Sequence, residues 1–497
     1  MVIMNEAQKK KQNEILRNAE EVIARGPYKA DWDSLAEHPV PQWYRDAKFG
    51  IFIHWGVYSV PAFGSEWYPR NMYLQGSPEY EHHRKTYGNQ KIFGYKDFIP
   101  MFRAEKFDAE KWLDLFEEAG ARYIMPVAEH HDGFQMYASG LSEWNAAKKG
   151  PCRDVIGELK QAAEKRNIVF TVSDHRAEHC WFFSGGTKFD SDVRDPANAD
   201  FYDDQTKCSC DLDSSQDILS SGAPEEHLKN WLARICEIVD KYHPKAIYFD
   251  WWIQNISFKP YLKKFAAFYY NRAAEWGQEV TIDYKFDAFP LRSAVFDVER
   301  GQMSSVNPLP WQTDTAIAEN SWGYTDGNKF KNPVGIVEDL VDIVSKNGCL
   351  LLNVGPRSDG TFTEEDSHVL REIGRWMKIN GEGIYGTKFW KVYGEGPTKV
   401  PDGSFTDTER TPYTSEDIRF TCKGATLYAF VMKYPENGKV TIRTLGRFTD
   451  FGSEVPVKDM CCINGSPLKF RKDENGMHIE GPKMKTDYPV CFRITLL

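Results

Sequence analysis

Ionisable and aromatic side chains follow several apolar, strand-like segments of this 497-residue chain. The clearest case is residues 49–53, FGIFI, which precede His54 directly and are soon followed by Glu66 and Trp67. Aromatic faces stack on the apolar face of a pyranose, while imidazole and carboxylate groups bind its hydroxyls. This segment therefore predicts a sugar-binding site.

The same pattern recurs along the chain, where other apolar segments also end in polar or aromatic residues. Buried polar groups need partners, and the hydroxyls of a sugar would supply them if these ends met at one mouth. The further candidates for substrate binding are His130, His131, His175, Tyr248, Lys285, Trp311 and Trp322.

Two carboxylates are candidates for bond cleavage. Asp250 follows an apolar segment, so a rigid strand would aim it as a nucleophile. Retaining glycoside hydrolysis needs a second carboxyl group about 5–5.5 Å away, with a raised pKa, to protonate the leaving oxygen. Glu299 is the best candidate for that group. The structural alternatives are a helix N-cap or a buried ion pair for Asp250, and an ion pair with Arg300 for Glu299.

A metal site is the rival interpretation of the histidines. His54, His131, His175 and Asp250 could in principle hold a hydrolytic metal ion. His130 and His131 are adjacent, so on a strand they would point in opposite directions. The His-x-His pair typical of such metal hydrolases is absent from the first strand. We therefore expect neither a metal nor another cofactor.

Apolar segments and amphipathic helical patterns alternate over residues 49–385, which predicts a parallel sheet covered by helices. Eight such units predict an α/β fold of the (β/α)8 barrel type, with weak or missing helices in its later half. A doubly wound open sheet is the alternative. In a barrel, the active site forms at the C-terminal ends of the strands. The eight predicted strands lie in residues 49–53, 122–129, 167–174, 245–252, 279–286, 293–300, 311–316 and 349–356.

The chain divides into three predicted parts. Residues 1–30 form an amphipathic helix that could pack on a neighbouring chain or the barrel floor. Residues 31–386 form the barrel. Residues 387–497 alternate short strands and turns, which is typical of an antiparallel β-sandwich.

Charge and cysteine usage limit the partners and the compartment. The net charge of −10 argues against nucleic acid or an anionic membrane surface, and no apolar run is long enough to span a bilayer. The N-terminus lacks an apolar signal core. The ten cysteines form no CxxC pair and are interpreted as reduced thiols of a cytoplasmic protein. A mature secreted form and a homo-oligomer stay open. For Cys208 and Cys210 in the acidic loop 203–217, a solvated insertion is favoured over a metal site.

Several ordered motifs over about residues 43–390 resemble those of the family 29 glycoside hydrolases, which are retaining, exo-acting α-L-fucosidases. The motifs are FGIFIHWGVYSVP, EHHDGF (129–134), the aspartate at 250, SWGY (321–324), LVDIVSKNGCLLLNVGPRSDG (340–360) and IGRWMKINGEGIYGT (373–387). The resemblance implies a barrel with a C-terminal β-sandwich, no metal, and a fucosylated oligosaccharide or glycoconjugate as substrate.

Carried over by position, the resemblance implies that Asp250 is the nucleophile. It also implies that the fucose-binding set comprises His54, Glu66, Trp67, His130 and His131.

The chain departs from the family pattern at other positions, three of which concern the site. Tyr248 stands where a tryptophan is usual, and Lys285 stands where arginine is frequent. Gln312, in WQT, replaces the glutamate of a common WET motif, and an amide cannot serve as the acid. Glu299 is therefore the expected acid/base, with Asp287, Asp297 and Asp314 as minor candidates.

Two other functions remain open. One is a catalytically weak or dead fucose-binding protein, which Gln312 would fit. The other is a related retaining glycosidase that acts on a different sugar.

Overall fold

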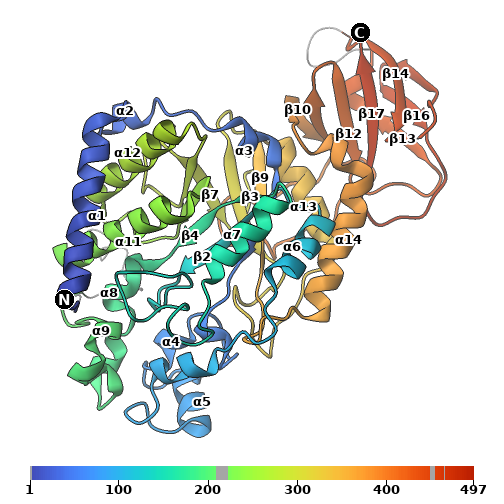
Figure 1. Cartoon of the computed structure of the whole chain (residues 1–497). Coiled ribbons are helices and arrows are strands. Elements are labelled where there is room, and N and C mark those ends of the chain that lie inside the picture. Colours follow the sequence, from blue (N-terminus) through green and yellow to red (C-terminus); the bar gives the residue numbers. More distant parts are fainter. Residues whose placement is uncertain (1–2, 209–221, 448–453, 464) are drawn as a thin grey trace.

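The computed structural model describes residues 3–208, 222–447, 454–463 and 465–497. Helices surround a central sheet, and a second group of strands lies at one side of it (Figure 1). Cys210 and most of the acidic loop 203–217 lie outside the described residues.

The central sheet is a closed parallel barrel. Its order is β1-β9-β8-β7-β6-β5-β4-β2, every neighbouring pair is parallel, and β1 also pairs with β2 to close the ring. The short strands β3 and β4 both pair with β2, so together they form one of the eight strands of the barrel. Closure confirms the barrel, and the open-sheet alternative is wrong. The strands are β1 (Phe49–Ile53), β2 (Tyr123–Glu129), β3 (Val169–Phe170), β4 (Val172–Asp174), β5 (Ala246–Phe249), β6 (Thr281–Tyr284), β7 (Val295–Glu299), β8 (Trp311–Ala316) and β9 (Gly348–Val354).

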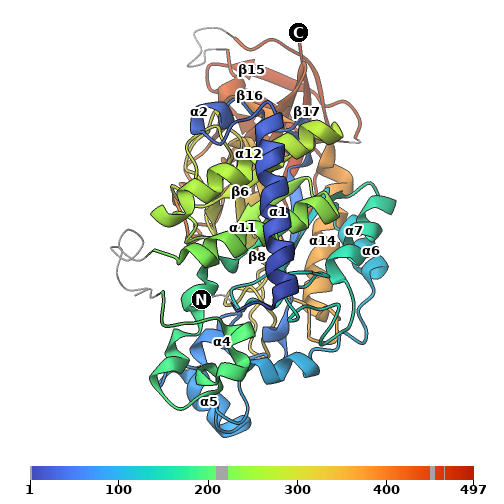
Figure 2. The same ribbon diagram turned by 60° about the vertical axis from the view of Figure 1, so that its left-hand side comes forward.

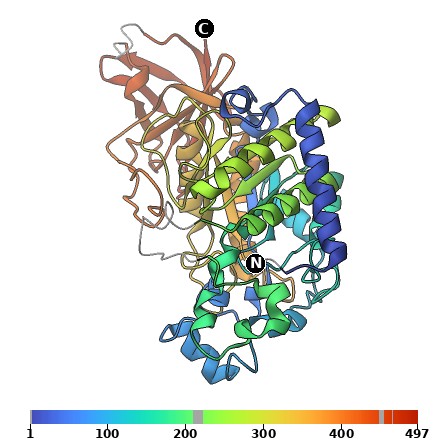
Figure 3. The ribbon, with the colours of Figure 1, turned by 90° about the vertical axis from the view of Figure 1, so that its left-hand side faces the viewer.

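Amphipathic helices cover the outside of the barrel (Figure 3). They begin at well-formed caps: Asp108 and Asp154, for example, accept backbone hydrogen bonds at the starts of α6 and α7. Residues 285–310 are all described and hold no helix, so the prediction of missing helices in the later half is confirmed. The covering helices are α6 (Ala109–Glu118), α7 (Val155–Lys165), α11 (Glu225–Tyr242), α12 (Lys259–Trp276), α13 (Pro333–Ser345) and α14 (Glu364–Asn380).

The N-terminal helix α1 (Glu6–Arg25) confirms the amphipathic pattern. A capping box between Asn5 and Gln8 begins it. It buries Ile15, Ala19 and Val22 and crosses the outer surfaces of α11 and α12 (Figure 2). Packing on the barrel floor was therefore the wrong expectation, because the apolar stripe of α1 meets the helix layer.

The C-terminal strands form two antiparallel sheets, which confirms the predicted β-sandwich. Phe420, Leu427, Met477 and Ile479 belong to one apolar core between them. The larger sheet, in the order β10-β11-β12-β17-β14, contacts α14, whose Trp376 indole donates to the Pro489 carbonyl at 2.8 Å. The strands are β10 (Lys388–Glu395), β11 (Ile418–Lys423), β12 (Thr426–Val431), β13 (Lys439–Ile442), β14 (Val457–Cys462), β15 (Phe470–Asp473), β16 (Gly476–Glu480) and β17 (Val490–Leu496).

Short helices occupy the connections. The loop after β1 and the loop after β4 hold several of them, which lie close together at one end of the barrel in Figure 1. Among the described helices, none is long and apolar enough to cross a membrane. The nine described cysteines are free thiols. The short helices are α2 (Trp32–Leu35), α3 (Gln42–Ala47), α4 (Tyr68–Asn71), α5 (Pro78–Thr86), α8 (His179–Phe182) and α9 (Ala199–Tyr202).

Candidate active site

The carboxyl ends of the barrel strands surround a cavity of about 440 Å³. Parallel strands bring their ends to one mouth, so residues far apart in sequence meet there. All but one of the predicted site residues line this cavity. They are His54, Glu66, Trp67, His130, His131, His175, Tyr248, Asp250, Lys285, Glu299 and Trp322.

Asp250 follows β5 directly and its carboxylate is held by three cationic or imidazole groups. Its Oδ1 lies 2.8 Å from Lys285 Nζ, and its Oδ2 lies 3.0 Å from His175 Nδ1 and 3.4 Å from His131 Nε2. Burial alone would raise the pKa of Asp250. The Lys285 charge and the His175 hydrogen bond hold that pKa well below its usual value. Asp250 is therefore an ionised carboxylate whose position is fixed by these contacts.

Lys285 lies between the two candidate carboxylates. Its ammonium nitrogen is 2.8 Å from Asp250 Oδ1 and 2.7 Å from Glu299 Oε2. Because both oxygens contact the same nitrogen, at 2.8 and 2.7 Å, they can lie at most about 5.5 Å apart. That upper limit is compatible with the roughly 5–5.5 Å spacing of retaining glycosidases and lies below the roughly 6.5–9.5 Å spacing of inverting ones.

Glu299 ends β7 and titrates differently from Asp250. Burial raises its pKa to about 7, and the Asp250 carboxylate adds to the rise, although Lys285 lies close and acts in the opposite direction. The pKa of Asp250 thus lies below the usual range of a carboxyl group, and that of Glu299 lies above it. Asp250 therefore favours the anion and Glu299 the protonated acid.

His131 adds a second positive charge beside Asp250. Its Nδ1 contacts Glu178 Oε2 at 3.0 Å and the His175 carbonyl at 2.9 Å. Burial lowers the pKa of His131, but the charges of Glu178 and Asp250 outweigh burial and raise it to about 9. The imidazolium of His131 therefore helps to keep Asp250 ionised.

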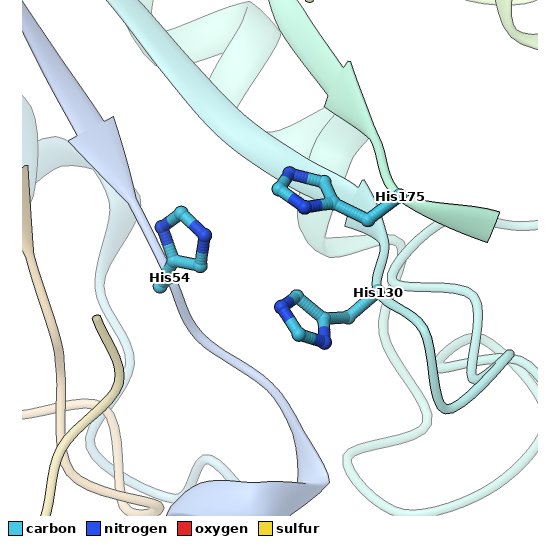
Figure 4. A group of neighbouring side chains, drawn as sticks. All are labelled: His54, His130 and His175. Atoms are coloured by element: carbon cyan, nitrogen blue, oxygen red, sulfur yellow. The ribbon is translucent and has the colours of Figure 1, made fainter. Parts of the chain in front are cut away.

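The imidazoles of His54, His130 and His175 face one space from three different strand ends (Figure 4). His54 and His130 are buried, and burial holds the pKa of each well below its usual value, so both rings are neutral. His130 Nδ1 has no hydrogen-bond partner among the described residues. A neutral ring with an unpaired, buried nitrogen can bind a substrate hydroxyl.

Ligand atoms of these residues lie close enough together to hold a metal ion. Two groups of three residues qualify, and in each the ligand atoms lie within 4.8 Å of one another. The first group is His54, His130 and His175, and the second is His131, His175 and Asp250. Both groups need His175, whose Nδ1 contacts Asp250 and whose Nε2 lies 3.0 Å from Ser173 Oγ. A metal ion would have to displace one of these partners, so the donor set fits a metal poorly.

Glu66 connects the first strand end to the SWGY motif. Its Oε2 accepts hydrogen bonds from the Ser321 hydroxyl at 3.1 Å and the Trp322 amide at 2.9 Å. The Trp322 ring stacks on His54, with centroids 5.2 Å apart. His54 is also held by Asn353 Oδ1, 2.7 Å from its Nδ1. Residues that follow β1 and β8, together with Asn353 near the end of β9, thus fix one wall of the cavity.

Trp311 and Gln312 do not reach the cavity. Trp311 begins β8, so it lies at the opposite end of the strand, where its indole donates to the Lys346 carbonyl at 2.9 Å. Gln312 is buried inside the barrel, between Tyr123, Tyr44 and Asp297. The prediction that Trp311 contacts substrate is wrong. The amide at Gln312 is a structural group below the site and no sign of a lost catalytic acid.

Side chains alternate along a strand, so Asp314, two residues after Gln312, points to the same side of β8 but lies nearer the cavity. Asp314 lines it and accepts a hydrogen bond from the Tyr248 hydroxyl at 2.9 Å. The other minor acid candidates are placed elsewhere: Asp297 lies one level below Glu299 against Gln312, and Asp287 is exposed beside another pocket. Tyr248 is thus a floor residue of the cavity.

Four aromatic residues that line the cavity were not among the predicted site residues, namely Phe52 in β1, Trp251 directly after Asp250, Phe286 and Phe405. Phe286 follows β6, and Phe405 lies in the loop between β10 and β11, and both line the cavity while remaining 48% and 60% exposed. Phe286 adjoins Lys285 and could have been included as a strand-end aromatic. Phe405 carries no such signal, because it belongs to a loop of the C-terminal sheets.

Comparisons with known proteins find matches over most of the chain. The family model described as alpha-L-fucosidase matches residues 15–382, and that of the alpha-L-fucosidase C-terminal domain matches residues 411–495. The tissue alpha-L-fucosidase of Homo sapiens is 31% identical over 431 residues, covering 84% of this chain and 81% of the relative. The plasma alpha-L-fucosidase of Homo sapiens is 30% identical over 476 residues, covering 93% and 90%.

Solved structures show the same architecture. The crystal structure of Thermotoga maritima alpha-fucosidase superimposes with a TM-score of 0.72 at 28% identity, covering 94% of this chain and 100% of that one. The structure of the same enzyme in complex with fucose gives the same values.

Proposed function

The chain belongs to the α-L-fucosidase family of glycoside hydrolases, and from this we propose that it hydrolyses terminal α-L-fucosides with retention of configuration. One observation carries the mechanistic part of the proposal. Asp250 and Glu299 contact the same Lys285 nitrogen, so their facing oxygens lie no more than about 5.5 Å apart, which is compatible with a double displacement.

In the first step, an oxygen of Asp250 attacks the anomeric carbon of fucose. The bond to the leaving oxygen breaks, and Glu299 gives that oxygen its proton. Lys285 and His131 keep Asp250 ionised until the attack, because their positive charges oppose the effect of burial on its pKa. The product of this step is a covalent fucosyl-enzyme.

In the second step, Glu299 acts as a base. It removes a proton from water, the hydroxyl oxygen attacks the anomeric carbon, and Asp250 leaves as a carboxylate. The charge of Asp250 raises the pKa of Glu299 in the free enzyme. This contribution disappears while Asp250 is an ester, so the pKa of Glu299 falls at the stage when its base form is needed.

The walls of the cavity would hold the fucose ring. We assign the hydroxyls to His54, His130 and Glu66, because neutral imidazoles and a buried carboxylate offer both donors and acceptors. Trp67, whose ring lies 5.1 Å from that of His131, would pack on the C5 methyl group. The proposed substrates are fucosylated oligosaccharides or glycoconjugates.

Azide rescue of two variants tests the roles of the carboxylates. With an activated aryl α-L-fucoside, Asp250→Gly should lose at least about 10⁴-fold in kcat. Azide should restore turnover and give the β-fucosyl azide, because azide enters on the face that Asp250 occupied. Glu299→Ala with azide should give the α-fucosyl azide, because azide then attacks the fucosyl-enzyme.

Other outcomes would select other functions. Near wild-type turnover by Asp250→Gly would remove the nucleophile assignment. Fucose binding by calorimetry, with no turnover of any fucoside, would select a binding protein. A panel of aryl glycosides would reveal a different sugar if another glycoside were cleaved faster.

The compartment and assembly state are also proposals. Nine described free thiols fit a reducing, cytoplasmic environment. Cell fractionation and light scattering would test location and a homo-oligomer, respectively.

A further inference from the structure

A loop from the C-terminal sheets reaches the active-site cavity. It comprises residues 396–417, between β10 and β11, and we call it the β10–β11 loop. Phe405 in this loop lines the same cavity as Asp250 and Glu299, although the barrel strands supply most of the lining. The mouth of the site is therefore completed by a segment outside the barrel.

Backbone hydrogen bonds hold the β10–β11 loop directly on the end of β7. The Phe405 amide donates to the carbonyl of Glu299 at 2.9 Å, and Gly403 and Gln302 exchange backbone hydrogen bonds in both directions. A Cβ on Gly301 would lie 1.8 Å from the Gly403 carbonyl oxygen, so only glycine permits this approach. The phenyl group is thus positioned by the same residue that is the proposed acid/base.

A buried carboxylate anchors the loop on its other side. Asp407 Oδ2 contacts Arg300 Nε at 3.2 Å, accepts from Thr315 Oγ1 at 2.6 Å and pairs with Lys331. Burial raises the pKa of Asp407, but these two cations outweigh burial and lower it. Such a paired, buried charge fixes the loop against the barrel and makes Phe405 a rigid part of the mouth.

Two phenyl groups at this mouth remain open to solvent. Phe405 is 60% exposed and Phe286 is 48% exposed, and the backbone of each has a positive φ, of 59° and 55°. Non-glycine residues adopt this conformation uncommonly, and such strain concentrates at ligand sites. If the apolar face of a sugar packed on either phenyl ring, that ring would lose contact with water, which favours binding.

We propose that Phe405 and Phe286 form the binding site for the leaving group, a hexopyranose unit whose apolar face packs on them. The inference rests on the proposed function, because Glu299 protonates the leaving oxygen and Phe405 is fixed to the Glu299 backbone. The C-terminal sheets thereby contribute to the selection of the aglycone, while the barrel selects the fucose ring.

Two substrates distinguish a role in binding the leaving group from a general effect on catalysis. α-L-Fucosyl fluoride has no ring in its leaving group, whereas an α-L-fucosyl hexopyranose disaccharide has one. For Phe405→Ala, kcat/KM should fall about tenfold or more on the disaccharide and change less than about twofold on the fluoride. Phe405→Tyr should keep activity near wild type on both substrates. Phe286→Ala, like Phe405→Ala, should lose activity on the disaccharide and keep it on the fluoride. Ile92→Ala, which removes an 83% exposed side chain that does not line the cavity, should affect neither substrate.

Inhibition by free fucose checks that the ring site of each variant is intact, so its inhibition constant should not change. Equal losses on both substrates would overturn the proposal, since Phe405 would then act through the Glu299 backbone. No loss on the disaccharide would overturn it as well. A wild-type protein that cleaves neither substrate would instead refute the proposed function, and with it this site.

Discussion

One ammonium group sets the electrostatics of the site at the scale of single residues. Lys285 contacts both Asp250 and Glu299, yet the pKa of Asp250 is held low while that of Glu299 is raised to about 7. The difference arises because His175 and His131 also contact Asp250, whereas Glu299 is buried and faces the Asp250 charge. At neutral pH, Asp250 is therefore ionised, whereas a substantial fraction of Glu299 carries its proton.

The pH dependence of kcat/KM follows from these two groups. Glu299 must carry a proton to act as the acid, so activity should fall as the pH rises through about 7. Asp250 must be ionised, so activity should persist down to acidic pH, below the ordinary range of aspartate. Glu299→Gln should lose the alkaline decline along with about 10²–10⁴-fold of its rate on unactivated substrates. A wild-type decline that Glu299→Gln retains would contradict this assignment.

Lys285 should influence the rate and the pH profile together. Its charge lowers the pKa of Glu299, so Lys285→Met should move the alkaline decline to higher pH. Loss of a charge that favours ionised Asp250 should also reduce kcat/KM by about 10²-fold. Lys285→Arg keeps the cation and should retain most of the rate. An unshifted decline in Lys285→Met would show that Lys285 does not control the acid.

The sequence predicts residues at strand ends well and residues elsewhere poorly. Asp250 and Glu299 follow or end apolar strands, so their placement follows from the barrel itself. Trp311 was misplaced because β8 begins at that residue, which puts it at the opposite end from the cavity. Gln312 was misinterpreted for a similar reason, since two positions along a strand separate the interior from the mouth.

Local sequence patterns determine the helices and strands, whereas contacts between distant segments position the residues at the mouth of the cavity. The eight strands and the presence of covering helices between them could be predicted because apolar runs and helical periodicity are local features. The docking of the β10–β11 loop on β7 depends on a close approach of Gly301 to Gly403, which no local pattern encodes. Phe405 was therefore beyond prediction from the sequence.

Substitution at Gly301 tests the docking of this loop. Gly301→Ala places a methyl group against the Gly403 carbonyl, so the free energy of unfolding should fall by about 1–3 kcal/mol. Activity on a fucosyl disaccharide should fall as well, because Phe405 and the Glu299 backbone would both shift. Gly327→Ala is the matched control, since no atom lies within 4 Å of its added Cβ. Urea unfolding that places both variants at the same midpoint would contradict the close approach.

A buried ion network joins the barrel and the C-terminal sheets at the scale of the whole molecule. Asp342 on α13 contacts Arg419 of β11 and Lys346, each at 2.5 Å, and all three side chains are buried. Burial raises the pKa of Asp342, but these cations outweigh burial and lower it. Because α13 also covers the barrel, this network couples the two parts.

Removal of Arg419 should weaken that coupling. Arg419→Leu leaves Asp342 with one cation, so the free energy of unfolding should fall by about 3 kcal/mol. Arg443→Leu, which breaks an exposed pair with Glu416, should leave the urea midpoint nearly unchanged. Equal midpoints for the two variants would mean that the buried network contributes little. A second unfolding transition in Arg419→Leu would show that the two parts had separated.

The stereochemistry of the first product tests the central claim most directly. Time-resolved proton NMR of wild-type hydrolysis of an aryl α-L-fucoside distinguishes the two anomers of fucose before they interconvert. The spacing of Asp250 and Glu299 predicts that α-L-fucose forms first, as a double displacement requires. Initial formation of β-L-fucose would contradict the account, because it would mean that water attacks directly and that Asp250 is not the nucleophile.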